Sequence, residues 1–210
     1  MATDVQPPLS ERLRDLIGQI RAIAGAGSDG AAIGASIARA LRPHLGARDL
    51  LLPEHCVPDP VKYRQHVLHV EPGGRFSVVS LVWLPGQATP IHDHVSWCVV
   101  GVHQGHEFEA RYALREVDGT AYLVAAGHSV NETRSATALT PPGDIHRVEN
   151  RGPGVAISLH IYGADIARLG SSIRRCYDLP IRRAAAPPEP GNGIAPLGGS
   201  FTSVPRRKAR

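Results

Sequence analysis

Four residues in the middle of the chain have the types and spacing of a metal site. His92 and His94 are two residues apart, Cys98 follows four residues later, and His146 lies in a separate region. Side chains at positions i and i+2 of a β-strand point to the same face, so His92 and His94 can present two imidazoles to one ion. The Pro-Pro-Gly turn at residues 141–143 would aim His146 inward as a third ligand. Three neutral imidazoles suit zinc, copper, iron or nickel, so the ligands alone do not select the metal.

These two regions resemble the paired metal-binding motifs of the cupin barrels. The first motif reads G-x5-H-x-H-x3-E-x6-G, and residues 86–105 match it except at the glutamate position, which is Cys98. The second motif reads P-x-G-x2-H-x3-N after a leading glycine; residues 141–150 match it, and Ser135 replaces that glycine. The resemblance implies a mainly β protein with the cupin (jelly-roll β-barrel) fold. An isolated pair of histidines would be interpreted as core or surface residues, but two motifs in register favour a metal site.

A second group of polar residues alternates along one predicted strand. Ser158, His160 and Tyr162 would share one face, where a serine hydroxyl can fix the tautomer of an imidazole and the imidazole can orient a phenol. Such a chain places an acidic proton near a metal. The same alternation is typical of an ordinary strand with a polar outer face, and the neighbouring three-histidine motif favours the functional interpretation.

Together these segments resemble the cysteine dioxygenase-type thiol dioxygenases, which are mononuclear non-haem iron cupins. The similar stretch runs from residue 63 to residue 163, about half of the chain, and its matching segments are residues 63–66, 75–80, 92–94, 142–146 and 158–163. The resemblance implies Fe(II) held by His92, His94 and His146, and an outer-sphere triad of Ser158, His160 and Tyr162. It also implies an enzyme that uses O2 to convert a small thiol to its sulfinic acid. Loss of the glutamate leaves three neutral ligands and open positions for a thiolate and O2.

Cys98 and Tyr162 raise the question of a covalent link. Some members of this family form a thioether between a cysteine at the former glutamate position and the tyrosine of the triad, whereas many bacterial members have glycine there. This chain has both partners. The alternative is a small buried thiol that packs as a hydrophobic side chain.

Substrate choice is open between two small thiol carboxylates. Family members that prefer L-cysteine carry an arginine on this Tyr-Arg-x segment that pairs with the carboxylate, whereas members that prefer 3-mercaptopropionate carry glutamine there. Residues 63–66 read Tyr-Arg-Gln-His, so Gln65 resembles the glutamine type. In that type an arginine from beyond the tyrosine pairs with the carboxylate, and Arg168 is the nearest candidate, although its spacing from Tyr162 does not match well.

Two functions of other classes use the same histidines. A zinc or nickel cupin isomerase or hydrolase needs the three imidazoles but not the Ser-His-Tyr strand. A non-catalytic small-ligand-binding cupin is disfavoured because the sequence shows no separate DNA-binding or effector module.

The elements that must position these residues follow from the hydrophobic pattern. A helix is expected from Ser10, with an apolar stripe at Leu13, Ile17, Ile20 and Ala24, and a second helix over residues 31–41. Strands are expected over residues 75–84, 97–102, 108–114, 120–124, 135–139 and 155–161. The expected organisation is a helical segment (1–45) packed on the barrel, the barrel with the metal site (46–182), and a flexible Pro/Gly-rich basic tail (183–210).

Composition limits the partners. The 210 residues are 42% hydrophobic, as in an ordinary folded domain. Three widely spaced cysteines favour a reducing compartment, and neither a membrane span nor a secretory leader is expected, so the predicted location is cytoplasmic. The net charge is +4, but four basic residues lie in the last six positions, so no nucleic-acid partner is predicted. We expect a small thiol and O2 as partners, and a monomer or weak homo-oligomer.

Overall fold

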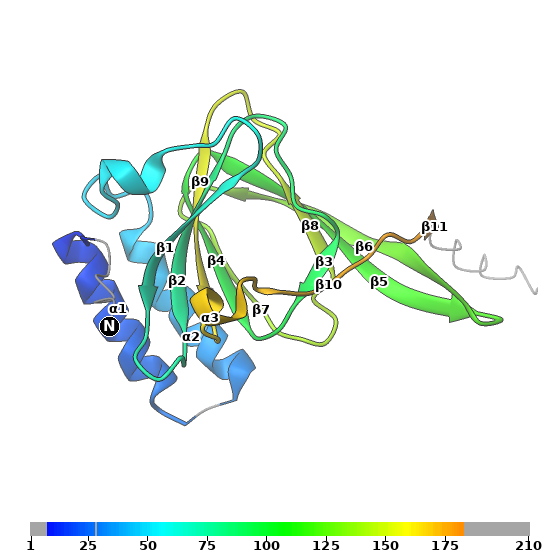
Figure 1. The fold of residues 1–210 in the computed structure, drawn as a ribbon, viewed down its shortest axis with the longest axis horizontal. Helices are drawn as coiled ribbons and strands as arrows, with labels where there is room; N and C mark the ends of the chain where they lie inside the picture. The colour runs from blue at the N-terminus through cyan, green and yellow to red at the C-terminus, as the bar shows by residue number, and fades with distance from the viewer. Residues whose placement is uncertain (1–7, 28, 183–210) are drawn as a thin grey trace, which may run out of the picture.

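Two helices are followed by two facing β-sheets in the computed structural model, which describes residues 8–27 and 29–182 (Figure 1). One sheet has the strand order β1-β2-β9-β4-β7, and the other has the order β10-β3-β8-β5-β6-β11. Neighbouring strands are antiparallel, except that β11 pairs in parallel with β6. The sheets enclose a jelly-roll barrel, so the predicted fold class, a mainly β cupin with N-terminal helices, is confirmed.

The strands predicted from apolar segments of the sequence are observed in the structure. Their bounds are β1 (Arg64–Val70), β2 (Ser77–Trp83), β3 (His92–His94), β4 (Cys98–Gln104), β5 (His106–Val117), β6 (Thr120–Glu132), β7 (Ala136–Leu139), β8 (His146–Glu149), β9 (Ala156–Tyr162), β10 (Ile173–Cys176) and β11 (Ile181–Arg182). All six predicted strands are present. The β5–β6 hairpin is longer than predicted because its distal half projects away from the barrel, on the side opposite the helices (Figure 1).

The helices begin at capping side chains. Helix α1 (Glu11–Ala24) starts after Ser10, whose hydroxyl oxygen accepts a hydrogen bond from the backbone N–H of Leu13 at 3.1 Å, as predicted. Helix α2 (Gly30–Leu41) starts one residue earlier than predicted, because Asp29 caps it through the N–H of Ala32 at 2.8 Å. Three short helices connect the remaining elements: η1 (Arg42–His44), η2 (Pro53–Cys56) and α3 (Ile166–Leu169).

Hydrophobic side chains cover both faces of the sheet that carries β2, β4 and β9. On the outer face, α1 and α2 pack against it, and the contact is so close at Gly101 that a Cβ there would lie 2.5 Å from Leu41. On the inner face, Trp83 and Tyr162 belong to a second cluster inside the barrel. Strands buried on both faces are mostly apolar, which is why these strands could be predicted from the sequence. The polar residues of β9 therefore point into a closed interior.

Two further expectations concern the basic tail and membrane-spanning helices. The predicted basic tail, residues 183–210, lies outside the described residues. Among the helices of the described part, none combines the length and the apolar content needed to cross a bilayer.

Candidate metal centre and its surroundings

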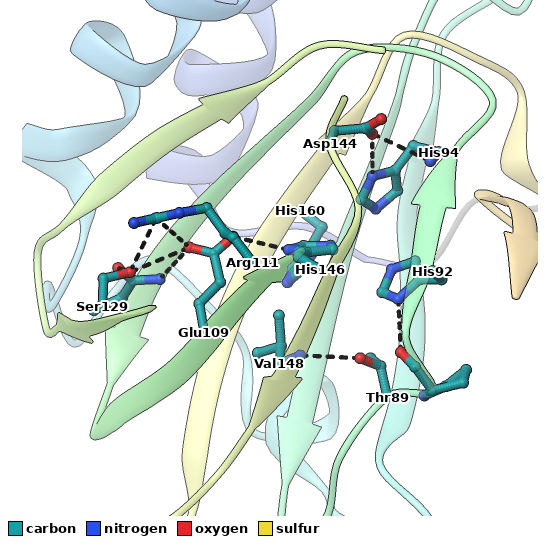
Figure 2. Close-up of polar contacts among 12 residues, drawn as sticks. Thr89, His92, His94, Glu109, Arg111, Ser129, Asp144, His146, Val148 and His160 are labelled. Atoms are coloured by element: carbon teal, nitrogen blue, oxygen red, sulfur yellow. Dashed lines mark hydrogen bonds and ion pairs between the residues drawn. The ribbon is translucent and has the colours of Figure 1, made fainter. Parts of the chain in front are cut away.

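Three histidines from two strands meet inside the barrel (Figure 2). Strand β3 supplies His92 and His94, and β8 supplies His146, which is the cross-strand partner of His92. Their candidate ligand nitrogens all lie within 4.8 Å of one another, and each residue is at most 4% exposed. The alternation of β3 puts Asp93 on the other side, where its carboxylate accepts hydrogen bonds from Arg174 and, at 2.8 Å, from the hydroxyl of Tyr177.

Hydrogen bonds at Nδ1 fix the orientation of all three rings. The acceptors are Pro90 O for His92 (3.0 Å), Asp144 Oδ2 for His94 (3.0 Å) and Glu109 Oε1 for His146 (2.8 Å). A carbonyl or a carboxylate can only accept, so each Nδ1 carries the hydrogen and each Nε2 keeps a lone pair. Within the described residues, His146 Nε2 is buried without a hydrogen-bond partner. Three such nitrogens facing one point are a donor set that fits a divalent transition metal.

Electrostatics keep the His92 ring neutral and favour the ionised form of the two outer carboxyls. Burial, followed by the neighbouring His146 and His94, lowers the pKa of His92 to about 3. Burial by itself would raise the pKa of Glu109, but the hydrogen bond and charge of His146, with further contacts, hold it below its usual range. The pKa of Asp144 is lowered in the same way, because the contacts of His94 outweigh its burial. The site thus combines three buried imidazoles with two outer carboxylates, an arrangement typical of metal centres.

A chain of hydrogen bonds lies beside the histidines on β9. Ser158 Oγ contacts His160 Nε2 at 3.0 Å, and the hydroxyl of Tyr162 contacts His160 Nδ1 at 3.1 Å. The ring centroids of Tyr162 and His94 are 6.0 Å apart. Burial lowers the pKa of His160 well below its ordinary value and raises that of Tyr162 well above its own. The imidazole is therefore neutral and the phenol keeps its hydrogen.

A small cavity of about 20 Å³ separates the three histidines from the β9 chain. Its other lining residues are Tyr63, Gln65, Leu81, Trp83, Thr89, Val148, Ser172 and Ile173. A second cavity of about 390 Å³ shares Tyr63, Gln65 and Ile173 with it and also contacts the exposed Lys62 and Arg64. The shared residues form the mouth of the inner cavity.

A family model described as cysteine dioxygenase type I matches residues 53–169. This range is more than half of the chain, and it contains the three histidines and the Ser158–His160–Tyr162 chain. The chain belongs to the cysteine dioxygenase type I family.

Several proteins of known name are similar to part of the chain. Cysteine dioxygenase type 1 of Danio rerio is 28% identical over 106 residues, which is 50% of this chain and 52% of the relative. The chain therefore matches about half the length of that relative. Among solved structures, a cupin superfamily protein of Desulfitobacterium hafniense DCB-2 is 13% identical, with a TM-score of 0.40 over 58% of this chain and 96% of that one. A double-stranded β-helix protein of Klebsiella pneumoniae subsp. pneumoniae MGH 78578 is 21% identical, with a TM-score of 0.38 over 57% and 91%.

The two candidate substrate residues of this cysteine dioxygenase family member lie in different places. Gln65 lines the mouth of the inner cavity, next to Tyr63, whose ring stacks on Trp83 with centroids 4.4 Å apart. Arg168 lies on α3 and lines a separate cavity with Glu71 and Asp165. The next residue after Tyr162 that lines the inner cavity is Ser172. The pairing of Arg168 with the substrate carboxylate stays a prediction. No arginine or lysine of the described chain lines the inner cavity.

Cys98 and Tyr162 face each other across β4 and β9. They are direct cross-strand partners, and both are buried. Burial, followed by nearby carboxylates, raises the pKa of the Cys98 thiol well above its usual range, so it is a neutral thiol. The phenol of Tyr162 lies close enough to Cys98 to be affected by it.

The sequence did not reveal several residues of the site. Glu109 is 37 positions from His146, and no spacing links the two, because cross-strand pairing is not visible in one sequence. Asp144 did carry a signal, since it precedes His146 by two residues at the end of a tight turn. Ser172 interacts with the phenol of Tyr162 and follows the short helix α3, which the hydrophobic pattern did not predict.

Proposed function

We propose that this protein is a non-haem Fe(II) thiol dioxygenase that uses O2 to convert a small thiol carboxylate to its sulfinic acid. Three converging Nε2 atoms beside the Ser158–His160–Tyr162 chain, in a member of the cysteine dioxygenase family, are the observation that supports it. His92, His94 and His146 would hold the iron. The bound iron would bring thiolate and O2 together and supply the redox chemistry.

The residues around the iron would each act on the substrate through a defined atom. Tyr162 would donate its phenolic hydrogen to the reacting oxygen or to the substrate, because its raised pKa keeps that hydrogen in place. Trp83, Leu81 and Val148 would exclude water from the cavity. Glu109 and Asp144 would hold the ligand rings in their binding orientation.

Oxygen consumption by the iron-loaded protein tests this proposal directly. The substrates compared are L-cysteine, 3-mercaptopropionate and cysteamine, and the product is identified as a sulfinic acid by mass spectrometry. Metal analysis of protein purified without added metal separates the alternatives, because a zinc or nickel hydrolase or isomerase would carry those metals and consume no oxygen. A non-catalytic binding protein would bind thiols without turnover.

Gln65 is expected to decide between the two thiol carboxylates. An amide cannot grip a carboxylate with two charged hydrogen bonds as a guanidinium can, so we expect 3-mercaptopropionate to be favoured slightly over L-cysteine. In Gln65→Arg, the ratio of kcat/KM for L-cysteine to that for 3-mercaptopropionate should rise, by roughly 10-fold at most. Arg168→Gln is the matched control and should leave the ratio unchanged, since Arg168 lies in another cavity. A parent that prefers L-cysteine and shows no shift in Gln65→Arg would exclude Gln65 from substrate choice.

Cys98 and Tyr162 have two alternatives during turnover, a thioether link or a free buried thiol that packs as a hydrophobic side chain. In the link, the Cys98 sulfur would bond to a ring carbon of Tyr162, and the thiol hydrogen and the ring hydrogen would leave with two electrons that O2 accepts. Intact-mass measurement after incubation with Fe(II), substrate thiol and O2 separates the two, because only the link gives a loss of two hydrogen masses. Cys98→Ala should show no such loss, and an unchanged mass in the active parent would count against the link.

A further inference from the structure

Glu107 is a buried acidic side chain for which the proposed reaction has no role. It lies on β5 and is 0% exposed. Neither of its carboxyl oxygens makes a hydrogen bond of good geometry with any described residue. The hydroxyl of Ser158 and the indole N–H of Trp83 nevertheless lie close enough to influence its ionisation. Glu107 therefore lies beside Ser158, at the opposite end of the hydrogen-bonded Ser158–His160–Tyr162 chain from Tyr162.

The surroundings of Glu107 favour its neutral form. Burial, followed by the negative charge of Glu109 two residues along the same strand, raises the pKa of Glu107 to about 7, although Ser158 and Trp83 act in the opposite direction. The two carboxyls also line one closed cavity of about 10 Å³, together with Asn131, Thr137 and His146. Glu109 keeps its charge because His146 and other donors outweigh its burial, whereas the burial of Glu107 outweighs the effect of Ser158 and Trp83. The pKa values of the two neighbouring acids are thus pushed apart.

The hydrogen bonds of the β9 chain can run in two directions. Neutral His160 carries one hydrogen, on either Nδ1 or Nε2. If Ser158 donates to Nε2, then Nδ1–H donates to the oxygen of Tyr162, and the phenolic hydrogen is free to point into the cavity. If Nε2–H donates to Ser158, then Nδ1 accepts the phenolic hydrogen, and Tyr162 has none left for a substrate. The two contacts at 3.0 and 3.1 Å are compatible with both directions.

The number of lone pairs on Ser158 Oγ decides between these directions. A hydroxyl oxygen accepts at most two hydrogen bonds. Trp83 Nε1–H already donates one, at 3.3 Å. A protonated Glu107 would donate the second, so Ser158 could accept nothing from His160 and would have to donate to Nε2. An ionised Glu107 would instead take the hydroxyl hydrogen of Ser158 and enforce the opposite direction.

We propose that Glu107, as a neutral carboxylic acid, is a positioning residue that fixes the direction of the Ser158–His160–Tyr162 chain and so frees the phenolic hydrogen of Tyr162 for the substrate. This inference rests on the proposed function, because it assigns Glu107 a part in the same reaction. It acts through three intervening groups and touches neither substrate nor metal.

Turnover of iron-loaded single and double variants tests the proposal. Glu107→Leu removes the donor, so kcat should fall by about 10-fold while KM and iron content stay at the parental values. Glu107→Gln is neutral and keeps an N–H donor, so kcat should remain within about 3-fold of the parent. In a Tyr162→Phe background, Glu107→Leu should not lower kcat further, because the hydrogen-bonded groups on β9 then have no phenolic hydrogen to direct. Glu116→Leu, the same change at an exposed position of β5, is the matched control.

If the kcat of the double variant falls by the product of the two single losses, Glu107 has only a structural role. That result would overturn the proposal. Infrared spectroscopy supplies a second measurement that does not depend on Glu107→Leu folding. The spectra of the iron-loaded parent and of Glu107→Gln are compared at ~pH 6, about one unit below the pKa of Glu107. The difference, parent minus variant, should contain the C=O stretch of a protonated carboxylic acid. Carboxylate bands in its place would also overturn the proposal. A parent that consumes no oxygen with any thiol would instead refute the proposed function, and the infrared result would still report the state of Glu107.

Discussion

Replacing His146 with alanine is expected to abolish iron loading. The three imidazoles are the converging donors of the site, and His146 Nε2 has no other partner within the described residues. Loss of a ligand should weaken iron binding by more than the roughly 10- to 100-fold caused by loss of an outer partner. The same result is expected for His92→Ala and His94→Ala. Iron content after loading and desalting, measured by mass spectrometry, checks each variant.

His128→Ala is the matched control for this experiment. His128 is exposed on β6, where it stacks on Phe108, so its replacement should leave iron content unchanged. Circular dichroism separates loss of metal from loss of fold. Stoichiometric iron in a folded His146→Ala protein would mean that another group, such as Cys98, Asp93 or Glu107, completes the coordination, and the assignment of three histidine ligands would then be wrong.

The metal ligands were predictable from the sequence because each carries a local signal. His92 and His94 share a face through the two-residue period of a strand, and a turn of fixed composition precedes His146. The apolar strands and the capped helices were predictable for the same reason, since periodicity and caps are properties of neighbouring residues. The short strand β8 was missed because its four residues mix polar and apolar types without a clear alternation.

The residues that surround the ligands could not be predicted because they depend on cross-strand register. Glu109 reaches His146 through the pairing of β5 with β8, and Glu107 reaches Ser158 across the barrel. Arg168 follows Tyr162 closely in the sequence, but it lies on the short helix α3 and lines a separate cavity, so its pairing with the substrate stays a prediction. Distance along the sequence gave no guide to distance in space at either place.

Replacing Tyr162 with phenylalanine is expected to lower turnover by roughly one to two orders of magnitude while iron affinity stays near the parental value. The substitution keeps the buried ring and removes the hydroxyl that contacts His160 Nδ1 at 3.1 Å. Tyr162 is not one of the converging ligands, so iron loading should not depend on it. The expected change is in kcat, because the phenolic hydrogen acts on the reacting atoms. Steady-state oxygen consumption and iron content measured on the same preparation check the prediction.

Tyr112→Phe is the control that separates chemistry from packing. Tyr112 packs against the cluster of Leu123 and Ile145, outside the residues that line the inner cavity, so losing its hydroxyl should not change kcat. A parental rate in Tyr162→Phe would mean that the β9 chain is structural. A fall in rate with a parallel loss of iron would mean that the hydroxyl supports the ligands. The proton-donor role therefore requires a fall in kcat with full iron content.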